Sequence, residues 1–328
     1  MMRVVYWSDV KDKDLQFLEE GLDEEIELTN IPRDDEEELV EKAERFDTII
    51  GAWVPYEFLE KADNLKYFII PFAGVPKRDR ENLRDFDDIT VINSHFNSWL
   101  VAEHAWTLLS ALVKRICPIH ERLKKGDWTP RYDHWCGRTL KDKHLLLLGC
   151  GAIGRDIAKI AMVFDMKVSA VKRTYEEVPN VDQVGTGDDL HDFLSKADFV
   201  ISTLPFTGET ERYIGEEEFK VMKDDSYLVN VGRGPVIDEK ALYQALKEGK
   251  IAGAAIDTWW NYPKGKDSRK NTSPSDYPLN EFDNVVFSPH RSSQVEEIER
   301  YRMESLVKIL NSLNEGKLIN IVDIERGY

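Results

Sequence analysis

Residues 144–160 read HLLLLGCGAIGRDIAKI, an apolar run followed by a glycine-rich turn and a helical pattern. The glycines have Gly-x-Gly-x-x-Gly spacing. The first permits a tight turn, the second lets a pyrophosphate approach the backbone, and the third allows close helix–strand packing. The N–H groups at the start of the helix face the phosphates. In this strand-turn-helix context the motif predicts a dinucleotide site rather than an ordinary turn. The residues assigned to that site are Gly149, Gly151, Ala152, Ile153 and Gly154.

Strand-like and helix-like segments alternate along the rest of the chain. Short β-rich runs and amphipathic charged runs alternate over residues 1–95, and the alternation resumes after an irregular arm at 124–143. This order predicts an α/β protein with parallel sheets covered by helices, and 328 residues suffice for two domains. Four further elements are predicted: a helix at 98–116 with Pro118 beyond its end, a long loop at 263–284, a helix at 295–313 and a short strand at 318–322.

Composition and charge argue against several classes of partner. The formal net charge of -17 disfavours nucleic acid and anionic membranes, because binding to them depends on a basic surface. No apolar run approaches the ~18 residues of a membrane span, and the N-terminus has no secretory pattern, so we expect a cytoplasmic protein. The cysteines Cys117, Cys136 and Cys150 are too widely separated to indicate a disulfide framework or a metal site.

The end of the next predicted strand discriminates between the two nicotinamide dinucleotides. An NAD site places an acid about 20 residues beyond the glycines, where it binds the ribose hydroxyls. This chain has Lys172, Arg173 and Thr174 there instead. Two cations and a hydroxyl can bind a 2′-phosphate, which an acid would repel. We therefore expect NADP, with NAD as the alternative cofactor; the competing interpretation is that these are ordinary solvated surface charges.

Two further residues follow apolar strands in the second half of the chain. Arg233 comes directly after YLVNVG, and His290 directly after NVVFSP. The carboxyl ends of parallel strands face the ligand crevice, where an arginine can bind a carboxylate through two hydrogen bonds. A histidine has a pKa near the working pH and suits acid–base catalysis. Each residue alone is more often structural, but together beside a nicotinamide site they predict hydride transfer involving a carboxylate-bearing substrate.

Several ordered segments make the chain resemble the D-2-hydroxyacid dehydrogenase family over nearly its whole length. They include ITVINSHFNSWLVAEHAWTLL at 89–109, ADFVISTLPFTGETERYI at 197–214, LVNVGRGPVIDEKAL at 228–242 and NVVFSPH at 284–290. The resemblance implies two doubly wound domains of the α/β class. These are a flavodoxin-like substrate domain at 1–97 and 295–328, and an inserted Rossmann-type NAD(P)-binding domain at 98–294.

The resemblance also implies roles for individual residues. Arg233 would orient the substrate carboxylate and carbonyl, and His290 would be the acid–base. The other positions implied to contact the substrate are Gly74, Val75 and Asn97. The further positions implied to border the cofactor are Pro205, Thr207 and Asp257.

One position departs from the family pattern. Family members usually read Asp-Val-Phe-Glu-x-Glu-Pro here, and the second glutamate pairs with the catalytic histidine. This chain reads DTWWNYP at 257–263, which puts Tyr262 in place of that glutamate. A phenol can orient His290 by a hydrogen bond, but it supplies no negative charge to raise the pKa of the histidine. We expect Tyr262 to orient His290 in this way; the alternative is that Tyr262 points away and packs.

The combined prediction is an NADP-preferring oxidoreductase acting on a small 2-keto or D-2-hydroxy acid, with glyoxylate-like and hydroxypyruvate-like acids as generic candidates. Loss of the carboxylate leaves two alternatives open. One is a catalytically weak, nicotinamide-dependent regulatory or binding protein of the same fold. The other is a formate-like dehydrogenase, whose step moves a hydride and no proton. The resemblance further implies a homodimer, with Trp128, His134 and Trp135 of the arm as candidates to reach the partner's site.

Overall fold

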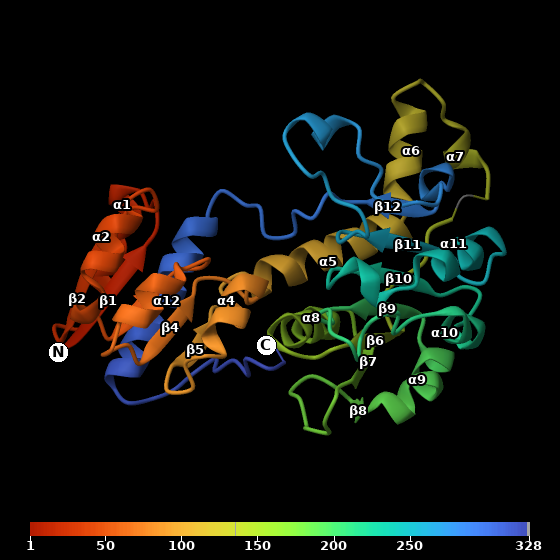
Figure 1. The fold of residues 1–328 in the computed structure, drawn as a ribbon. Helices are drawn as coiled ribbons and strands as arrows, with labels where there is room; N and C mark the ends of the chain where they lie inside the picture. The colour runs from red at the N-terminus through yellow and green to blue at the C-terminus, as the bar shows by residue number, and fades with distance from the viewer. Residues whose placement is uncertain (135, 327–328) are drawn as a thin grey trace. The chain divides into compact units, whose positions relative to one another are not determined.

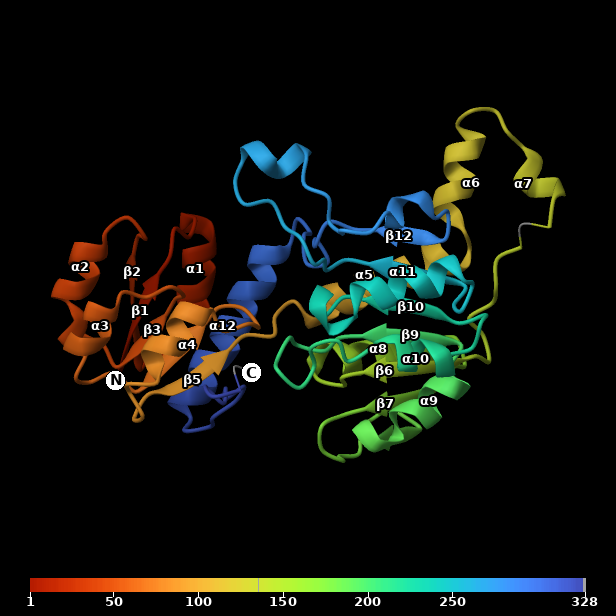
Figure 2. The same ribbon diagram turned by 45° about the vertical axis from the view of Figure 1, so that its right-hand side comes forward.

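The chain folds into two units in the computed structural model, which describes residues 1–134 and 136–326 (Figures 1 and 2). Unit 1 contains Met1–Asn97 and Val295–Tyr328, and unit 2 contains Ser98–Gln294. Each unit has its own sheet, with hydrophobic clusters on both faces. The substrate role of unit 1 and the cofactor role of unit 2 stay predictions.

Unit 1 alternates parallel strands with helices. Its elements are β1 (Met2–Trp7), α1 (Asp12–Gly21), β2 (Ile26–Ile31), α2 (Glu36–Glu41), η1 (Ala43–Arg45), β3 (Thr48–Ile50), α3 (Tyr56–Lys61), β4 (Tyr67–Ile70), α4 (Lys77–Leu83), β5 (Thr90–Asn93) and α12 (Ile298–Asn314). The strand order is β2-β1-β3-β4-β5, which is the flavodoxin-like order. Val5 and Phe68 pack in one cluster with α2, α3 and α4, whereas Val4 and Ile69 pack in another with α1 and α12. Burial on both faces explains why these strands are almost continuously apolar.

Unit 2 repeats this design with a larger sheet. Its elements are α5 (Ser98–Val113), α6 (Ile116–Leu123), α7 (Thr129–Tyr132), β6 (His144–Leu148), α8 (Ala152–Val163), β7 (Lys167–Val171), β8 (Gln183–Gly185), η2 (Gly187–Asp189), α9 (Leu190–Lys196), β9 (Phe199–Ser202), α10 (Glu216–Val221), β10 (Tyr227–Asn230), η3 (Gly234–Val236), α11 (Glu239–Lys247), β11 (Gly253–Ile256), η4 (Asp267–Lys270), η5 (Leu279–Glu281) and β12 (Val285–Phe287). The strand order is β12-β11-β10-β9-β6-β7-β8, with parallel pairing. Leu145 and Leu147 pack with α5 and α8, and Leu146 and Leu148 pack with α9, α10 and α11. The predicted class, α/β with two doubly wound parallel sheets, is confirmed.

Two predicted helix boundaries and one predicted strand differ from the structure. Helix α5 ends at Val113 and α6 begins at Ile116, so Pro118 lies in the first turn of a new helix, where its missing N–H breaks no helical bond. The last helix starts at Ile298 instead of 295. The predicted strand at 318–322 is wrong, because there a single antiparallel bridge joins Ile321 to Ile92.

The arm, the cysteines and the lengths of the helices bear on the remaining sequence predictions. The arm carries the short helix α7, and its Trp128 is 60% exposed. Trp135, a candidate to reach a partner subunit, lies outside the described residues. All three cysteines are free. None of the described helices has the length and apolar character needed to cross a membrane.

Candidate active site

The candidate site lies at the carboxyl edge of the unit 2 sheet. Loops that follow β6, β7, β9, β10, β11 and β12 carry most of the predicted residues. Strand order reverses between β6 and β9, because the chain runs outward through β7 and β8 before it returns to the other side of β6. Such a reversal separates the two neighbouring loops and opens the crevice in which open α/β sheets bind ligands.

The glycine-rich turn after β6 has the backbone that a pyrophosphate site requires. Gly149 has a φ of 82°, which a side chain would strain. A Cβ on Gly154 would lie 2.7 Å from the Gly149 carbonyl oxygen, so only glycine allows the helix to pack this closely. A Cβ on Gly151 would meet nothing within 4 Å, which leaves this face of the turn open. Helix α8 begins at Ala152 without a side-chain cap, so its first N–H groups remain available for phosphate oxygens.

The loop after β9 is tied to this turn. The hydroxyl of Thr203 donates a hydrogen bond to the Gly149 carbonyl oxygen at a distance of 2.9 Å. Thr210 stabilises the rest of the loop, because its hydroxyl donates to the Pro205 carbonyl oxygen at 2.6 Å and accepts from the Thr207 N–H at 2.8 Å. These contacts place Pro205 and Thr207 in an ordered loop beside the glycine turn.

Lys172, one of the two cations predicted at the end of β7, has an acidic partner. Lys172 donates to one carboxylate oxygen of Glu176, and Nη2 of Arg155 lies 3.0 Å from the other. These hydrogen bonds, first from Lys172 and then from Arg155, lower the pKa of the Glu176 carboxyl. Arg173 and Thr174 are exposed in the same loop.

Arg233 is presented by a loop that buried contacts hold in place. The side chain of Asn230, at the end of β10, donates to the Arg233 carbonyl oxygen at 3.0 Å and accepts from the Gly232 N–H at 3.1 Å. A Cβ on Gly234 would lie 2.3 Å from the backbone of Trp259, so glycine is needed for the Arg233 loop to lie against the loop after β11. The guanidinium itself is exposed and donates to the Gly232 carbonyl oxygen at 2.7 Å.

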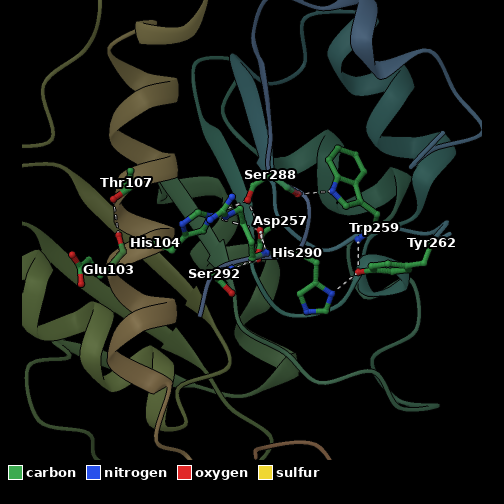
Figure 3. A network of polar contacts seen from close by, with 10 residues as sticks. Glu103, His104, Thr107, Asp257, Trp259, Tyr262, Ser288, His290 and Ser292 are labelled. Carbon is green, nitrogen blue, oxygen red and sulfur yellow. Dashed lines mark hydrogen bonds and ion pairs between the residues drawn. The ribbon is translucent and has the colours of Figure 1, made fainter. Parts of the chain in front are cut away.

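Tyr262 and His290 are brought together by the loops after β11 and β12 (Figure 3). The hydroxyl oxygen of Tyr262 lies 2.9 Å from Nδ1 of His290 and accepts a hydrogen bond from the Trp259 N–H at 3.1 Å. The phenol keeps a proton to donate and a second lone pair, so it can pair with either neutral tautomer of the ring. With Nδ1 occupied, Nε2 is the nitrogen left to serve a substrate. The alternative in which Tyr262 points away is wrong.

Asp257 anchors the turn that carries His290. Its side chain is fully buried, and it accepts hydrogen bonds from the Ser288 hydroxyl, from the Arg291 N–H at 3.0 Å and from the Ser292 N–H at 3.3 Å. Ser288 in turn contacts Nε2 of His104 at 2.9 Å. His290 has a φ of 53°, a left-handed conformation that costs a non-glycine residue about 1–2 kcal/mol. The hydrogen bonds to Asp257 offset that cost and fix the position of the ring.

The pKa values of His290 and Tyr262 are shifted in opposite senses. Partial burial, followed by the positive charge of Arg233, lowers the pKa of His290, while Asp257 opposes the shift. Partial burial also raises the pKa of Tyr262, which stays a neutral phenol. Burial by itself would raise the pKa of Asp257, but the contacts with His104, Ser288, Arg291 and Ser292 outweigh it and hold that pKa far below its ordinary range. Asp257 is therefore a buried anion, and His290 favours its neutral form.

The residues predicted to contact the substrate from unit 1 lie in two of its loops. Gly74 and Val75 fall between β4 and α4, and the side chain of Asn93 supports that loop by donating to the Ala73 carbonyl oxygen at 2.7 Å. Asn97 is the last residue of unit 1, directly before α5. Their roles toward a substrate stay predictions.

The family of the chain follows from its match to a family profile. Residues 106–292 match the profile described as D-isomer specific 2-hydroxyacid dehydrogenase, NAD binding domain. The chain belongs to the D-isomer specific 2-hydroxyacid dehydrogenase family. The resemblance noted from the sequence is thereby confirmed.

Relatives of this dehydrogenase-family chain have several named activities. It is 30% identical to the D-3-phosphoglycerate dehydrogenase of Methanocaldococcus jannaschii over 99% of the chain, but it covers only 60% of that relative's length. It is also 30% identical to the glyoxylate/hydroxypyruvate reductase B of an Enterobacter species, covering 92% of the chain and 94% of the relative. Among solved structures, an acyclic imino acid reductase in complex with NADPH and D-Arg aligns with a TM-score of 0.74 and 28% identity, over 98% of this chain and 100% of that one.

Several positioning residues of this family member are absent from the sequence predictions. They are Asn93, His104, Arg155, Glu176, Thr203, Thr210, Asn230 and Ser288. A polar residue that ends an apolar strand is a usable signal, and it would have found Asn93 and Asn230. The partners of His104, Thr203 and Ser288 are more than 30 residues away in sequence, so no local pattern indicates these contacts. Thr210 and Glu176 each contact a residue within five positions, but the predicted motifs do not include them.

Proposed function

We propose that the protein is an NADP-preferring oxidoreductase that transfers a hydride between nicotinamide and a small 2-keto or D-2-hydroxy acid. The observation that carries this proposal is the contact between Tyr262 and Nδ1 of His290, on a loop beside the one that presents Arg233. It leaves Nε2 of an oriented imidazole close enough to the exposed Arg233 guanidinium to feel its charge, at the carboxyl edge of the sheet. Relatives named glyoxylate/hydroxypyruvate reductase support small keto acids as the substrate class.

Each residue has a separate task in this reaction. When bound, the nicotinamide supplies or accepts the hydride. Arg233 binds the substrate carboxylate and polarises the neighbouring carbonyl. In reduction, Nε2 of protonated His290 gives its proton to the oxygen that becomes the hydroxyl; in oxidation, neutral His290 removes that proton. Because the pKa of His290 is lowered, the neutral ring dominates at neutral pH. The rate of reduction, which needs the protonated ring, is therefore lower relative to the rate of oxidation than it would be with a carboxylate partner.

Steady-state kinetics with purified protein test the proposal. Oxidation of NADPH and NADH is followed with glyoxylate, hydroxypyruvate and larger 2-keto acids, and reduction of NADP and NAD with the matching D-2-hydroxy acids. Turnover that is lost in Arg233→Gln and in His290→Phe, with cofactor binding retained, supports the assignment. Cofactor binding without turnover of any substrate across pH would instead favour a regulatory protein of the same fold.

Replacement of the carboxylate by Tyr262 favours one second candidate, the reduction of a C=N bond. A protonated imine already carries its proton, so hydride transfer gives a neutral amine and needs no charged histidine. One structural neighbour is named as an acyclic imino acid reductase. We distinguish this activity by measuring NADPH oxidation with a 2-keto acid in ammonium chloride and in potassium chloride of equal ionic strength. A rate that depends on ammonium supports imine reduction, and an equal rate in both salts supports keto-acid reduction.

A further inference from the structure

Glu176, in the loop after β7, forms ion pairs with two cations, Lys172 of the same loop and Arg155 of α8. Oε1 of Glu176 accepts a hydrogen bond from Arg155 at 3.0 Å, and Oε2 accepts one from Lys172. The side chain of Lys172 is only 14% exposed, whereas that of Glu176 is 58% exposed. The fold therefore holds the lysine in place, and the acid reaches it from the solvent side.

The cluster of Arg155, Lys172 and Glu176 is adjacent to the glycine turn. Arg155 directly follows Gly154, and Lys172 directly follows the last residue of β7. Burial raises the pKa of the Cys150 thiol inside the turn, the charges of Arg155 and Lys172 lower it, and that of Glu176 raises it. All three charged groups therefore lie close to the turn. In dinucleotide-binding sheets, the end of the strand that follows the glycine motif receives the adenosine ribose. The two cations thus stand where a 2′-phosphate would be bound.

A carboxylate and a phosphate compete for the same donors. Both accept charge-assisted hydrogen bonds from arginine and lysine. A phosphate monoester carries about -1.5 to -2 charges at neutral pH, so it would repel a carboxylate that stayed between the cations. A 2′-hydroxyl carries no charge and leaves the two ion pairs intact.

We propose that Glu176 is an internal competitor for the 2′-phosphate of NADP and sets the ratio at which the protein binds NADP and NAD. The inference rests on the proposed function, because it requires the adenosine end of a dinucleotide to lie at β7. Binding of NADP displaces Glu176 from Lys172 and Arg155, whereas binding of NAD does not. The preference for NADP is therefore smaller than the cations alone would produce, and removal of one negative charge enlarges it.

Calorimetric titration of the full chain tests this without catalysis. The ligands are adenosine 2′,5′-bisphosphate and 5′-AMP, which differ only in the 2′-phosphate. Glu176→Gln keeps the size of the side chain and removes its charge, so it should raise the affinity ratio for the bisphosphate over 5′-AMP about tenfold. The matched control is Glu177→Gln, which removes a neighbouring exposed acid that makes no ion pair with the described residues. Adding Lys172→Ala to Glu176→Gln should abolish the gain.

The outcomes separate the inference from the function on which it rests. An unchanged ratio in Glu176→Gln, with 5′-AMP still bound, overturns the role of Glu176 and leaves the dinucleotide site standing. An equal gain in Glu177→Gln also overturns it, since net charge alone would then explain the effect. Failure of the wild type to bind either ligand overturns the inference and the proposed function together. A thermal melt of each variant verifies that it is folded.

Discussion

The hydroxyl oxygen of Tyr262 lies 2.9 Å from Nδ1 of His290 and also accepts the Trp259 N–H. A carboxylate at this position would do two things: it would orient the imidazole and stabilise its protonated form. The phenol does only the first. This chain therefore keeps the contact that orients His290, the proposed acid–base group, but lacks the charge that would raise its pKa.

Replacing Tyr262 by glutamate should move the pH dependence of reduction. The proposed reduction needs protonated His290, so kcat/KM for a keto acid should fall as pH rises through the pKa of that ring. In the wild type this pKa is lowered from its ordinary value of about 6.5. A carboxylate at 262 opposes the lowering, and the decline should shift about one unit upward. The pH profiles of the wild type and Tyr262→Glu measure the shift, and identical profiles would contradict the pairing.

Tyr262→Phe is the matched control for charge. It removes the hydrogen bond to Nδ1 and leaves the Trp259 N–H without its acceptor. We expect kcat/KM to fall about threefold to tenfold, as for one lost neutral hydrogen bond, with no upward shift of the decline. A profile that moves upward in both variants would show that removal of the phenol, not addition of charge, causes the shift.

Asp257→Asn should destabilise unit 2 and lower kcat. The buried carboxylate accepts hydrogen bonds that hold the His290 turn, and losing charged acceptors of this kind costs about 1.5–3 kcal/mol. Because the folded-state pKa of Asp257 is depressed, its contribution is complete above the unfolded value of about 3.9 and is lost as pH falls toward the folded value. Urea unfolding should therefore give a constant difference between wild type and variant from about pH 6 to 8, and a smaller one in acid. A difference that grows in acid would falsify this assignment.

Gly234→Ala should lower the melting temperature, because the new methyl group forces the Arg233 loop away from Trp259. Its Cβ would lie 2.3 Å from the Trp259 backbone, which cannot yield as a flexible side chain could. Overpacking of this kind costs about 1–3 kcal/mol. A Cβ on Gly208 would meet nothing within 4 Å, so Gly208→Ala is the control and should leave the melting temperature nearly unchanged. Equal melting temperatures for the two variants would show that the contact is relieved at no cost.

Asn230→Ala should raise the KM for the keto acid more than it lowers kcat. The side chain ties the Gly232 N–H to the Arg233 carbonyl oxygen, so its loss loosens the residue proposed to bind the substrate carboxylate. The KM should increase about tenfold, in keeping with the loss of two hydrogen bonds made by the buried Asn230 side chain. Steady-state kinetics measure both constants, and Arg233→Lys provides the comparison in which the two-pronged contact itself is removed. A change confined to kcat would place Asn230 elsewhere in the reaction.

Much of the candidate site can be predicted from the sequence because its residues follow strands. The apolar runs that end before Gly149, Lys172, Arg233 and His290 indicate that these residues lie at one edge of a parallel sheet. Tyr262 could be located by counting from Asp257 to Pro263, but the direction of its hydroxyl could not. That direction depends on the loop after β12, which begins more than twenty residues later. The strand predicted at 318–322 failed for a similar reason, since pairing depends on a distant partner.

Local patterns in the amino-acid sequence specify the α/β class, the glycine turn and the substitution of a phenol for a carboxylate. These are local properties: apolar periodicity, glycine spacing and residue identity are read within a few positions. The fold adds three contacts that these patterns do not contain. Tyr262 contacts Nδ1 of His290, Asp257 holds the His290 turn, and Glu176 bridges Arg155 and Lys172. Each of these contacts includes a pair that folding brings together from separate loops or elements, and no single stretch of sequence records which side chains will meet.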